Sequence, residues 1–286
     1  KVYLITGCSS GLGYEIAITA LKAGHKVIAT SRNPSKTPDK VQQITNLGGQ
    51  WAALNVSSPT LEAQFHNTIL PLLPNGRLDT LINNAGIAVG SVVEDIHMDA
   101  ARDILETNFW GTMRLSRLAV PIMRAKGGGG NIVNISSSNA LLPLPMLSIY
   151  AASKSAIDSF SLSLAGEVAQ FGIRVMVVSP AGMRTSFVQN GEDQSQAGKD
   201  LREEYKGTSV EAVMHAITDL GNFKVDPVRA AAVIVAAIDG TGVFEGVPKD
   251  FFRLPIGAQS IDALEMRIGE LKGCLEGLSA VANSVD

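Results

Sequence analysis

The first thirty residues constrain the fold more than any other part of the sequence. The run "VYLIT" (residues 2–6) is apolar and β-branched, and it stops at a glycine. In the following "GLGYEIAITALKAG", Ile16, Ala20 and Ala23 recur at helical spacing, and "HKVIAT" is typical of a second strand. A strand, a tight glycine turn, a helix and another strand predict a right-handed parallel βαβ unit.

The same alternation continues along the chain. It predicts strands over residues 49–56, 78–86, 131–136 and 173–180, and helices over residues 58–73, 98–126 and 150–171. We find neither an internal repeat nor an interdomain linker. Because strands that alternate with helices form parallel sheets, we expect one α/β domain over residues 1–286, a doubly wound parallel sheet with helices on both faces.

Two segments depart from this alternation. Residues 186–226 are polar, contain no predicted strand and follow a strand end, so we expect a substrate lid, with a surface excursion of no function as the alternative. Residues 258–286 predict an amphipathic helix with an apolar seam of Ile261, Leu264, Ile268, Leu271, Leu275 and Leu278. We expect this helix to dock on its own domain near the lid; the alternative is pairing with another subunit.

Composition excludes several classes of function. The net charge is −3 without a long basic run, which argues against nucleic-acid binding. The longest apolar run, residues 230–238, is far shorter than the ~20 residues of a membrane span. The four histidines lack metal-ligand spacing, so we predict no metal site. The two cysteines are too few for a disulfide framework, so we expect a reducing, cytoplasmic setting.

The glycine turn "TGCSSGLG" (residues 6–13) has the features of a phosphate-binding loop. Gly7 allows the turn, Gly11 lets a pyrophosphate approach the backbone, and Gly13 lets the helix pack against the sheet. Free N–H groups at the helix N-terminus attract phosphates, and Ser9 and Ser10 add hydroxyl donors. Three residues separate the first two glycines, so the spacing differs from the usual dinucleotide fingerprint.

Four motifs together resemble the short-chain dehydrogenase/reductase family: "TGCSSGLG", "NNAG" (residues 83–86), "YAASK" (residues 150–154) and a serine thirteen positions before the tyrosine. The resemblance implies a single Rossmann-type domain of about seven parallel strands. It also implies hydride transfer between NAD(P) and an alcohol or carbonyl. Members of the family form dimers or tetramers through the helices that correspond to residues 98–126 and 150–171, so we expect a homodimer or homotetramer.

The resemblance assigns a catalytic tetrad to Asn108, Ser137, Tyr150 and Lys154. Ser136 and Ser138 flank the serine, but the thirteen-residue spacing favours Ser137. Lowering the pKa of a tyrosine from near 10 to around 7 requires about 4 kcal/mol. A lysine charge ~4 Å away supplies roughly that at an effective dielectric constant of 20, and i,i+4 spacing places Lys154 on the same helix face as Tyr150.

The cofactor prediction rests on "VIATSRNPSK" after the second strand. A site that prefers NAD carries an acidic residue here for the ribose 2′-hydroxyl, whereas this chain has Ser31 followed by Arg32. A guanidinium binds a 2′-phosphate through paired hydrogen bonds, so we predict NADP(H), with both residues contacting the phosphate. The other residues expected at the cofactor are Leu12, Asn55, Val56, Asn84, Ala85, Gly86, Tyr150, Lys154, Pro180, Gly182, Met183 and Thr185.

Two of these positions depart from the family pattern. Asn55 stands where the family commonly has an aspartate that binds the adenine, and Ala181 replaces a glycine that often follows the proline. An amide can still donate and accept at the adenine, and Gly182 can provide the missing flexibility. Thr185 remains available for the nicotinamide carboxamide.

The substrate is less constrained than the cofactor. The loop "ALLPLPMLSI" (residues 140–149) precedes Tyr150, and it predicts either a pocket for a small hydrophobic carbonyl compound or buried core. An epimerase, dehydratase or isomerase with the same fold is an alternative enzyme. A nucleotide-sensing regulatory protein is an alternative from another class.

Overall fold

The computed structural model describes residues 1–185 and 201–285. Within them, seven parallel strands form one sheet in the order β3-β2-β1-β4-β5-β6-β7. The strands are β1 Val2–Ile5, β2 Lys26–Ser31, β3 Gln50–Ala53, β4 Thr80–Asn83, β5 Gly130–Ile135, β6 Ile173–Pro180 and β7 Arg253–Ile256. The predicted doubly wound parallel sheet is therefore confirmed.

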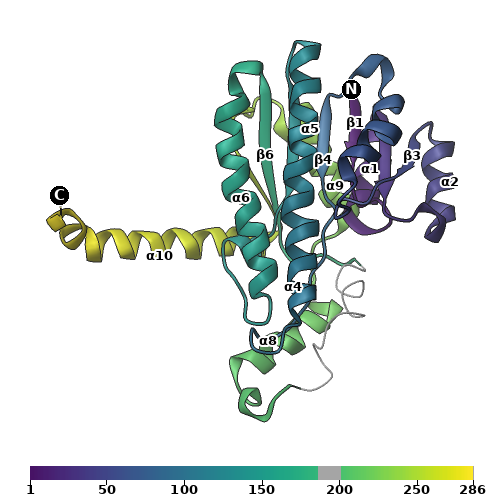
Figure 1. Cartoon of the computed structure of the whole chain (residues 1–286). Helices are drawn as coiled ribbons and strands as arrows, with labels where there is room; N and C mark the ends of the chain where they lie inside the picture. Colours follow the sequence, from purple (N-terminus) through teal and green to yellow (C-terminus); the bar gives the residue numbers. More distant parts are fainter. Residues whose placement is uncertain (186–200, 286) are drawn as a thin grey trace.

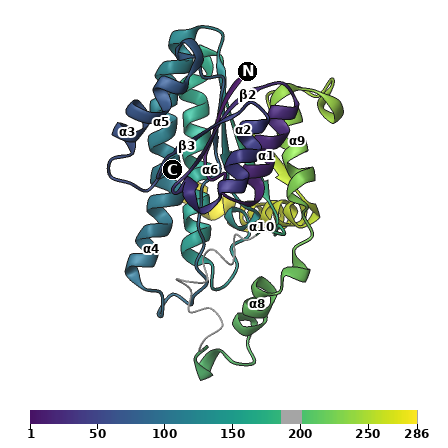
Figure 2. The same ribbon diagram turned by 90° about the vertical axis from the view of Figure 1, so that its right-hand side faces the viewer.

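Helices cover both faces of the sheet (Figures 1 and 2). One face carries α1 (Gly11–Lys22), α2 (Pro38–Asn46) and α9 (Pro227–Asp239), and the other carries α3 (Leu61–Gln64), α5 (Gly111–Lys126) and α6 (Ser148–Val168). The predicted helix over residues 98–126 is α4 (Met98–Leu105), a π-helical turn (Glu106–Trp110) and α5 in continuous succession. The helix predicted over residues 58–73 begins only at Leu61 and continues through a π-turn and a 3₁₀ turn to Leu72.

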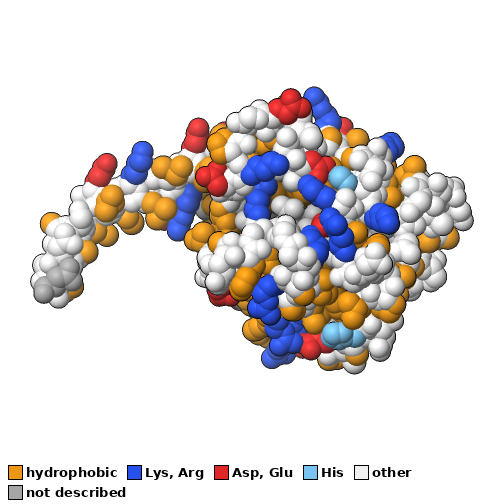
Figure 3. Space-filling view, turned by 90° about the horizontal axis from the view of Figure 1, so that it is seen from above, with side chains coloured by type: hydrophobic (Ala, Val, Ile, Leu, Met, Phe, Trp, Pro, Cys, Tyr) orange, Lys and Arg blue, Asp and Glu red, His pale blue; other side chains and the backbone are white. Residues whose placement is uncertain are grey.

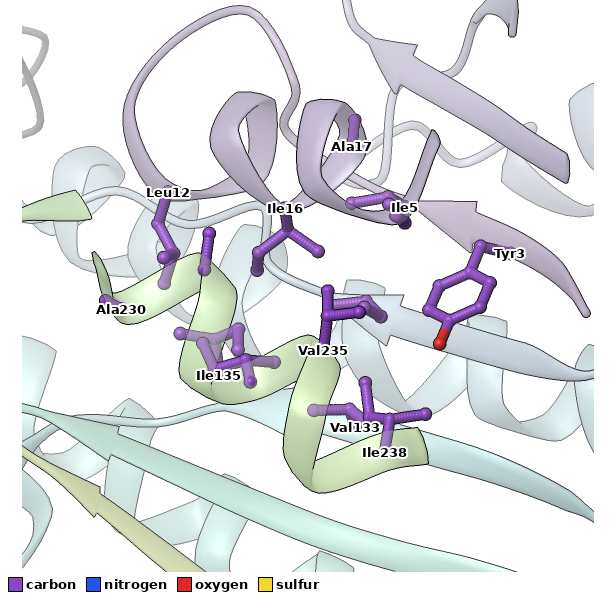
Figure 4. Packing of buried hydrophobic residues seen from close by; sticks show 14 of the residues in the cluster. Tyr3, Ile5, Leu12, Ile16, Ala17, Val133, Ile135, Ala230, Val235 and Ile238 are labelled. Carbon is purple, nitrogen blue, oxygen red and sulfur yellow. The ribbon is translucent and has the colours of Figure 1, made fainter. Parts of the chain in front are cut away.

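Two hydrophobic clusters hold these layers together, one on each face of the sheet. Figure 4 shows the first, in which Ile16 of α1 and Val235 of α9 meet over β1 and β5. The amino end of α9 is capped by the Asp226 carboxylate, which accepts hydrogen bonds from the N–H groups of Val228 (2.8 Å) and Arg229 (3.4 Å). Neither α9 nor β7 was assigned from the sequence.

The chain reverses its winding direction between β1 and β4, which are neighbours in the sheet. The loops that follow the carboxyl ends of β1 and β4 touch, since a Cβ added to Gly7 would lie 2.8 Å from the Cα of Ala85. Ligands of open α/β sheets bind outside the carboxyl ends of the strands at such a reversal. The fold therefore brings the glycine turn and the "NNAG" segment to one site.

The predicted lid, residues 186–226, lies partly outside the described residues, which resume at residue 201. The described part contains a 3₁₀ turn (Glu203–Tyr205) and α8 (Ser209–Thr218). It is tied to the loop between β4 and α4, because Arg202 Nε donates to both carboxylate oxygens of Asp95 at 2.9 Å and Tyr205 Oη donates to Glu94 at 2.6 Å. A substrate lid remains a prediction.

The prediction that the carboxyl-terminal helix docks on its own domain is wrong for most of its length. The first turns of α10 (Ala258–Ala282) pack on the domain through Ser260 and Ala263, which are buried. Beyond them α10 extends away from the sheet (Figure 1), and Leu271 and Leu275 of the apolar seam are 52% and 67% exposed. Only these first turns contact the domain, so most of the apolar seam remains exposed.

The described part of the chain contains neither a membrane-spanning helix nor a metal-binding cluster. None of its helices combines the length and the apolar character that crossing a membrane requires. Its histidine, cysteine and acidic side chains do not form any group of three that could hold a metal ion. Cys8 is buried and Cys274 is exposed, and both are free thiols.

Candidate active site

The glycine turn after β1 has the backbone shape that the sequence predicts. Gly7 and Gly11 have φ values of 71° and 57°, a left-handed conformation that glycine adopts without strain. The third glycine allows a close approach, because a Cβ on Gly13 would lie 2.3 Å from Asn84 Nδ2. That amide donates to the Thr6 carbonyl at 2.9 Å and the Gly7 carbonyl at 3.2 Å. Gly13 thus lets α1 pack against the end of β4.

The amino end of α1 fits the pyrophosphate of a dinucleotide. Ser10 is the N-cap residue, its backbone is extended, and its side chain does not cap the helix. The first turn of α1 carries no acidic residue, so the amide groups and the positive end of the helix dipole are directed at the glycine turn. Ser9 and Ser10 are partly exposed beside it, and Leu12 is buried beneath the turn.

At the end of β2, Arg32 is exposed, whereas Ser31 is buried and its hydroxyl accepts a hydrogen bond from Trp51 Nε1 at 3.1 Å. A second cation, which sequence reasoning missed, reaches this region from α2. Lys40 Nζ donates to the Ser9 carbonyl at 2.9 Å and lies 5.0 Å from the centre of the Tyr14 ring. Lys40 and Ser9 are 31 positions apart, so local sequence carries no signal of this contact.

The residues predicted at the adenine lie after β3. The Asn55 side-chain oxygen accepts hydrogen bonds from the Ser57 N–H (3.3 Å) and hydroxyl (2.9 Å), which leaves the amide group of Asn55 as the donor toward a ligand. Val56 is buried against α5, where a Cβ on Gly111 would lie 3.0 Å from the Val56 side chain.

The residues predicted at the nicotinamide follow β6. Pro180 ends the strand, and Met183 forms a β-bridge with Val225. Thr185 lies opposite the glycine turn, because a Cβ on Gly11 would approach the Thr185 side chain to 3.0 Å. Gly182 is closely packed, since a Cβ there would meet the Phe223 ring at 2.5 Å.

Asn108 lies in the π-turn between α4 and α5 and is fully buried. π-Turns inside helices are frequent at functional sites because they alter the direction of side chains. The Asn108 amide accepts from the Ile87 N–H at 2.8 Å and donates to the Ile87 carbonyl and the Ser153 hydroxyl, both at 2.9 Å. A Cβ on Gly86 would lie 3.2 Å from Asn108 Oδ1 and 3.5 Å from Lys154 Nζ, so the "NNAG" loop passes close to both side chains.

The structure distinguishes the three serines after β5. The hydroxyl of Ser136 is directed to the Lys154 carbonyl at 3.4 Å, and Ser138 begins a 3₁₀ turn. The hydroxyl of Ser137 hydrogen-bonds the Tyr150 side chain. It also accepts from the Asn139 N–H at 3.1 Å. Ser137 is thus the serine that faces Tyr150.

Tyr150 and Lys154 lie on the buried face of α6, with exposed fractions of 9% and 3%. Lys154 Nζ donates to the Ile135 carbonyl at 2.8 Å and lies 5.7 Å from the centre of the Tyr150 ring. Burial raises the pKa of Tyr150 above its usual value, and the hydrogen bond from Ser137 lowers it only in part. The expected net lowering of the Tyr150 pKa is therefore not seen, because burial has the larger effect.

Burial also lowers the pKa of Lys154 to about 8, and the charge of Asp158 one turn along α6 opposes this shift. The Asp158 carboxylate is 2.8 Å from the Arg253 guanidinium of β7. Sequence reasoning missed Asp158 and Ser153, although their spacings from Tyr150 and Lys154 place them on the same helix face. Ser153 links the tetrad, since its hydroxyl donates to the Tyr150 carbonyl at 2.7 Å and accepts from Asn108.

Comparison with known proteins identifies the family. Residues 1–196 match the model of the short-chain dehydrogenases, and the protein belongs to this family. It is 40% identical over 213 residues to the oxidoreductase claN of Passalora fulva, a match that covers 74% of this chain and 93% of that protein. It is also 35% identical over 190 residues to a 3-ketodihydrosphingosine reductase of Bacteroides thetaiotaomicron, covering 66% of each protein.

Among solved structures, a short-chain dehydrogenase from Streptomyces avermitilis is similar over 100% of this chain and 98% of its own length, with a TM-score of 0.85 and 31% identity. The family establishes an oxidoreductase that binds a nicotinamide dinucleotide. Structures that share the fold contain NAD in one case (TM-score 0.78, 22% identity) and NADP+ in another (TM-score 0.68, 24% identity). Family membership alone thus leaves the choice between the two cofactors open.

Proposed function

We propose that the protein is an NADP(H)-dependent oxidoreductase that interconverts a ketone or aldehyde and an alcohol on a small hydrophobic molecule. The observation that carries this proposal is the hydrogen bond between the Ser137 and Tyr150 hydroxyls in a buried site beside Lys154. Two hydroxyls that meet in this way can both bind one substrate oxygen.

The nicotinamide, when bound, supplies the hydride for the carbonyl carbon or accepts it from the alcohol. Tyr150 donates its proton to the substrate oxygen during reduction, and Ser137 holds that oxygen in place. Burial favours the protonated tyrosine, which suits an acid at neutral pH. In the reverse direction Tyr150 accepts the alcohol proton, and the Lys154 charge stabilises the phenolate.

The preference for NADP(H) rests on positive charge at the 2′-phosphate end of the site. Arg32 is exposed directly after β2, and Lys40 is fixed at the Ser9 carbonyl. Neither Ser31 nor Arg32 supplies the carboxylate that would bind a ribose 2′-hydroxyl. The Ser31 hydroxyl is buried against Trp51. We therefore expect Arg32 and Lys40 to hold the phosphate.

The loop over residues 140–149 supports a hydrophobic substrate. The interpretation of this loop as buried core fits only Met146, since the other residues of the loop remain at least partly accessible. The loop follows Ser137 and leads directly into α6, so apolar side chains border the reacting group.

We also propose a homodimer or homotetramer formed through the helices over residues 98–126 and 150–171. Trp110 and Leu162 expose 44% and 61% of their surface on this side of the molecule. Such exposed apolar side chains are typical of a surface that a second subunit covers.

The test is a comparison of NADPH and NADH with a panel of hydrophobic ketones and aldehydes, following nicotinamide absorbance. We expect turnover with NADPH. Arg32→Ala should weaken NADPH binding about 10- to 100-fold, the loss of one charge-assisted contact, and leave NADH binding nearly unchanged. Lys36→Ala, an exposed cation on the same loop, is the matched control and should change neither affinity.

Three results would contradict the proposal. Equal affinity for both cofactors, or equal weakening of both by Arg32→Ala, would refute the NADP(H) preference. Substrate conversion without a net change in absorbance would indicate an epimerase, dehydratase or isomerase. Nucleotide binding without turnover of any carbonyl compound would favour a nucleotide-sensing protein.

A further inference from the structure

The helix α10 leaves the domain after two buried contacts near its start. Ser260 Oγ donates to the Ser179 carbonyl at 2.6 Å, and Ala263 is 3% exposed. Every residue from Ile268 to Leu278 is exposed, because no other described part of the chain covers it. In Figure 3 this segment forms an arm, with hydrophobic side chains mostly along one edge and charged side chains mostly along the other.

The apolar edge has the heptad spacing of a coiled coil. Ile261, Ile268 and Leu275 occupy the first apolar position of successive heptads, and Leu264, Leu271 and Leu278 occupy the second. Apart from Leu264, which is partly buried, the seam residues expose between 43% (Ile261) and 67% (Leu275) of their surface.

Packing against a partner would stabilise this helix. Most helical stability in proteins comes from the packing of an apolar face, and glycine is the least favourable helix residue after proline. Gly269, Gly273 and Gly277 all lie in the arm, and a Cβ on each would meet open space, so none of them is required by a close contact within this chain.

We propose that α10 pairs with α10 of a second copy of this chain as an antiparallel two-helix coiled coil. This inference concerns a surface separate from the active site and from the helices over residues 98–126 and 150–171. Pairing the helices about a two-fold axis between residues 269 and 270 sets Ile268 of one copy opposite Leu271 of the other. Leu264 then faces Leu275, and Ile261 faces Leu278, so all six seam residues are covered.

Charge selects the antiparallel arrangement. In a parallel pair, Arg267 of one helix would lie beside Lys272 of the other, a repulsion that occurs twice. In the antiparallel pair, Glu265 and Lys272 lie on the same flank of the seam and attract each other, also twice.

The first experiment measures the mass of the full-length protein in solution by light scattering. Leu271→Asp places a charge in the seam, and we expect it to halve the mass. Met266→Asp is the matched control, because this exposed apolar residue lies outside the seam and the mass should not change. Since both residues are exposed, a cooperative thermal unfolding transition should show that each variant folds.

The second experiment fixes the orientation. A spin label on Ala280→Cys, in a Cys274→Ser background with Cys8 buried, reports the distance between the two copies. At 1.5 Å per residue the antiparallel pair separates the labels by about 30 Å, whereas a parallel pair brings them within about 15 Å. The proposal would be overturned by the short distance, by a monomeric wild type or by an unchanged mass for Leu271→Asp. It would also be overturned if wild-type monomers bound lipid vesicles and Leu271→Asp abolished that binding.

Discussion

Replacing Lys154 with methionine should remove a pH-dependent loss of stability, which arises because the folded protein buries the lysine charge. The lysine is 3% exposed, and its pKa is lowered from 10.5 to about 8. Between these two values the unfolded chain holds a proton that the folded chain has released. Stability therefore rises with pH across this window and is lost again as the pH falls through about 8.

The size of the effect follows from the two pKa values. Each pH unit between them corresponds to about 1.4 kcal/mol, so the window from about 8 to 10.5 amounts to about 3 kcal/mol. Methionine also removes the hydrogen bond to the Ile135 carbonyl. That loss changes stability by the same amount at every pH. The slope of the free energy of unfolding against pH therefore reports only the shifted pKa of Lys154.

Urea unfolding of the wild type and Lys154→Met at several pH values between 7 and 10.5 provides the measurement. We expect the free energy of unfolding of the wild type to rise by about 3 kcal/mol relative to the variant over this range. Parallel pH profiles for the two proteins would show that Lys154 has an ordinary pKa and would refute the reasoning.

The remaining predictions concern two local contacts. Ser137→Ala should lower turnover about 100-fold because its hydroxyl holds the substrate oxygen, whereas Ser136→Ala should remain within a few-fold of the wild type; comparable losses would contradict the assignment. Gly13→Ala should cost about 1–3 kcal/mol in urea unfolding and weaken nucleotide binding, because the new methyl group meets the Asn84 amide. Gly166→Ala, in open space on α6, is the control and should not destabilise the protein; stability of Gly13→Ala equal to this control would argue against the contact.

The fold was largely predictable because its strands are continuous apolar runs that end at glycines or polar turns. The strand β7 was not, since "RLPI" contains Pro255, which a sheet tolerates here because β7 is an edge strand. The helix α10 was predicted, but not its direction, because periodicity defines an apolar face and not what covers it.

In the candidate site too, the locally encoded features could be predicted and the long-range contacts could not. Tyr150, Lys154 and the glycine turn are local motifs whose spacing carries their geometry. Long-range contacts have no such signal, as in the case of Lys40 at the Ser9 carbonyl. The pKa of Tyr150 was expected to fall because only the nearby charge was considered, whereas burial, which depends on the whole fold, raises it.

The central claim is that Tyr150 delivers the proton during NADPH-dependent carbonyl reduction. The most direct test is a single turnover with NADPH deuterated at the transferred position, followed by mass analysis of the alcohol. The wild type and the control Tyr14→Phe should place deuterium on the product. Tyr150→Phe should bind NADPH within a few-fold of the wild-type affinity yet transfer deuterium at least about 100-fold more slowly. A deuterated alcohol formed by Tyr150→Phe at the wild-type rate would contradict the account.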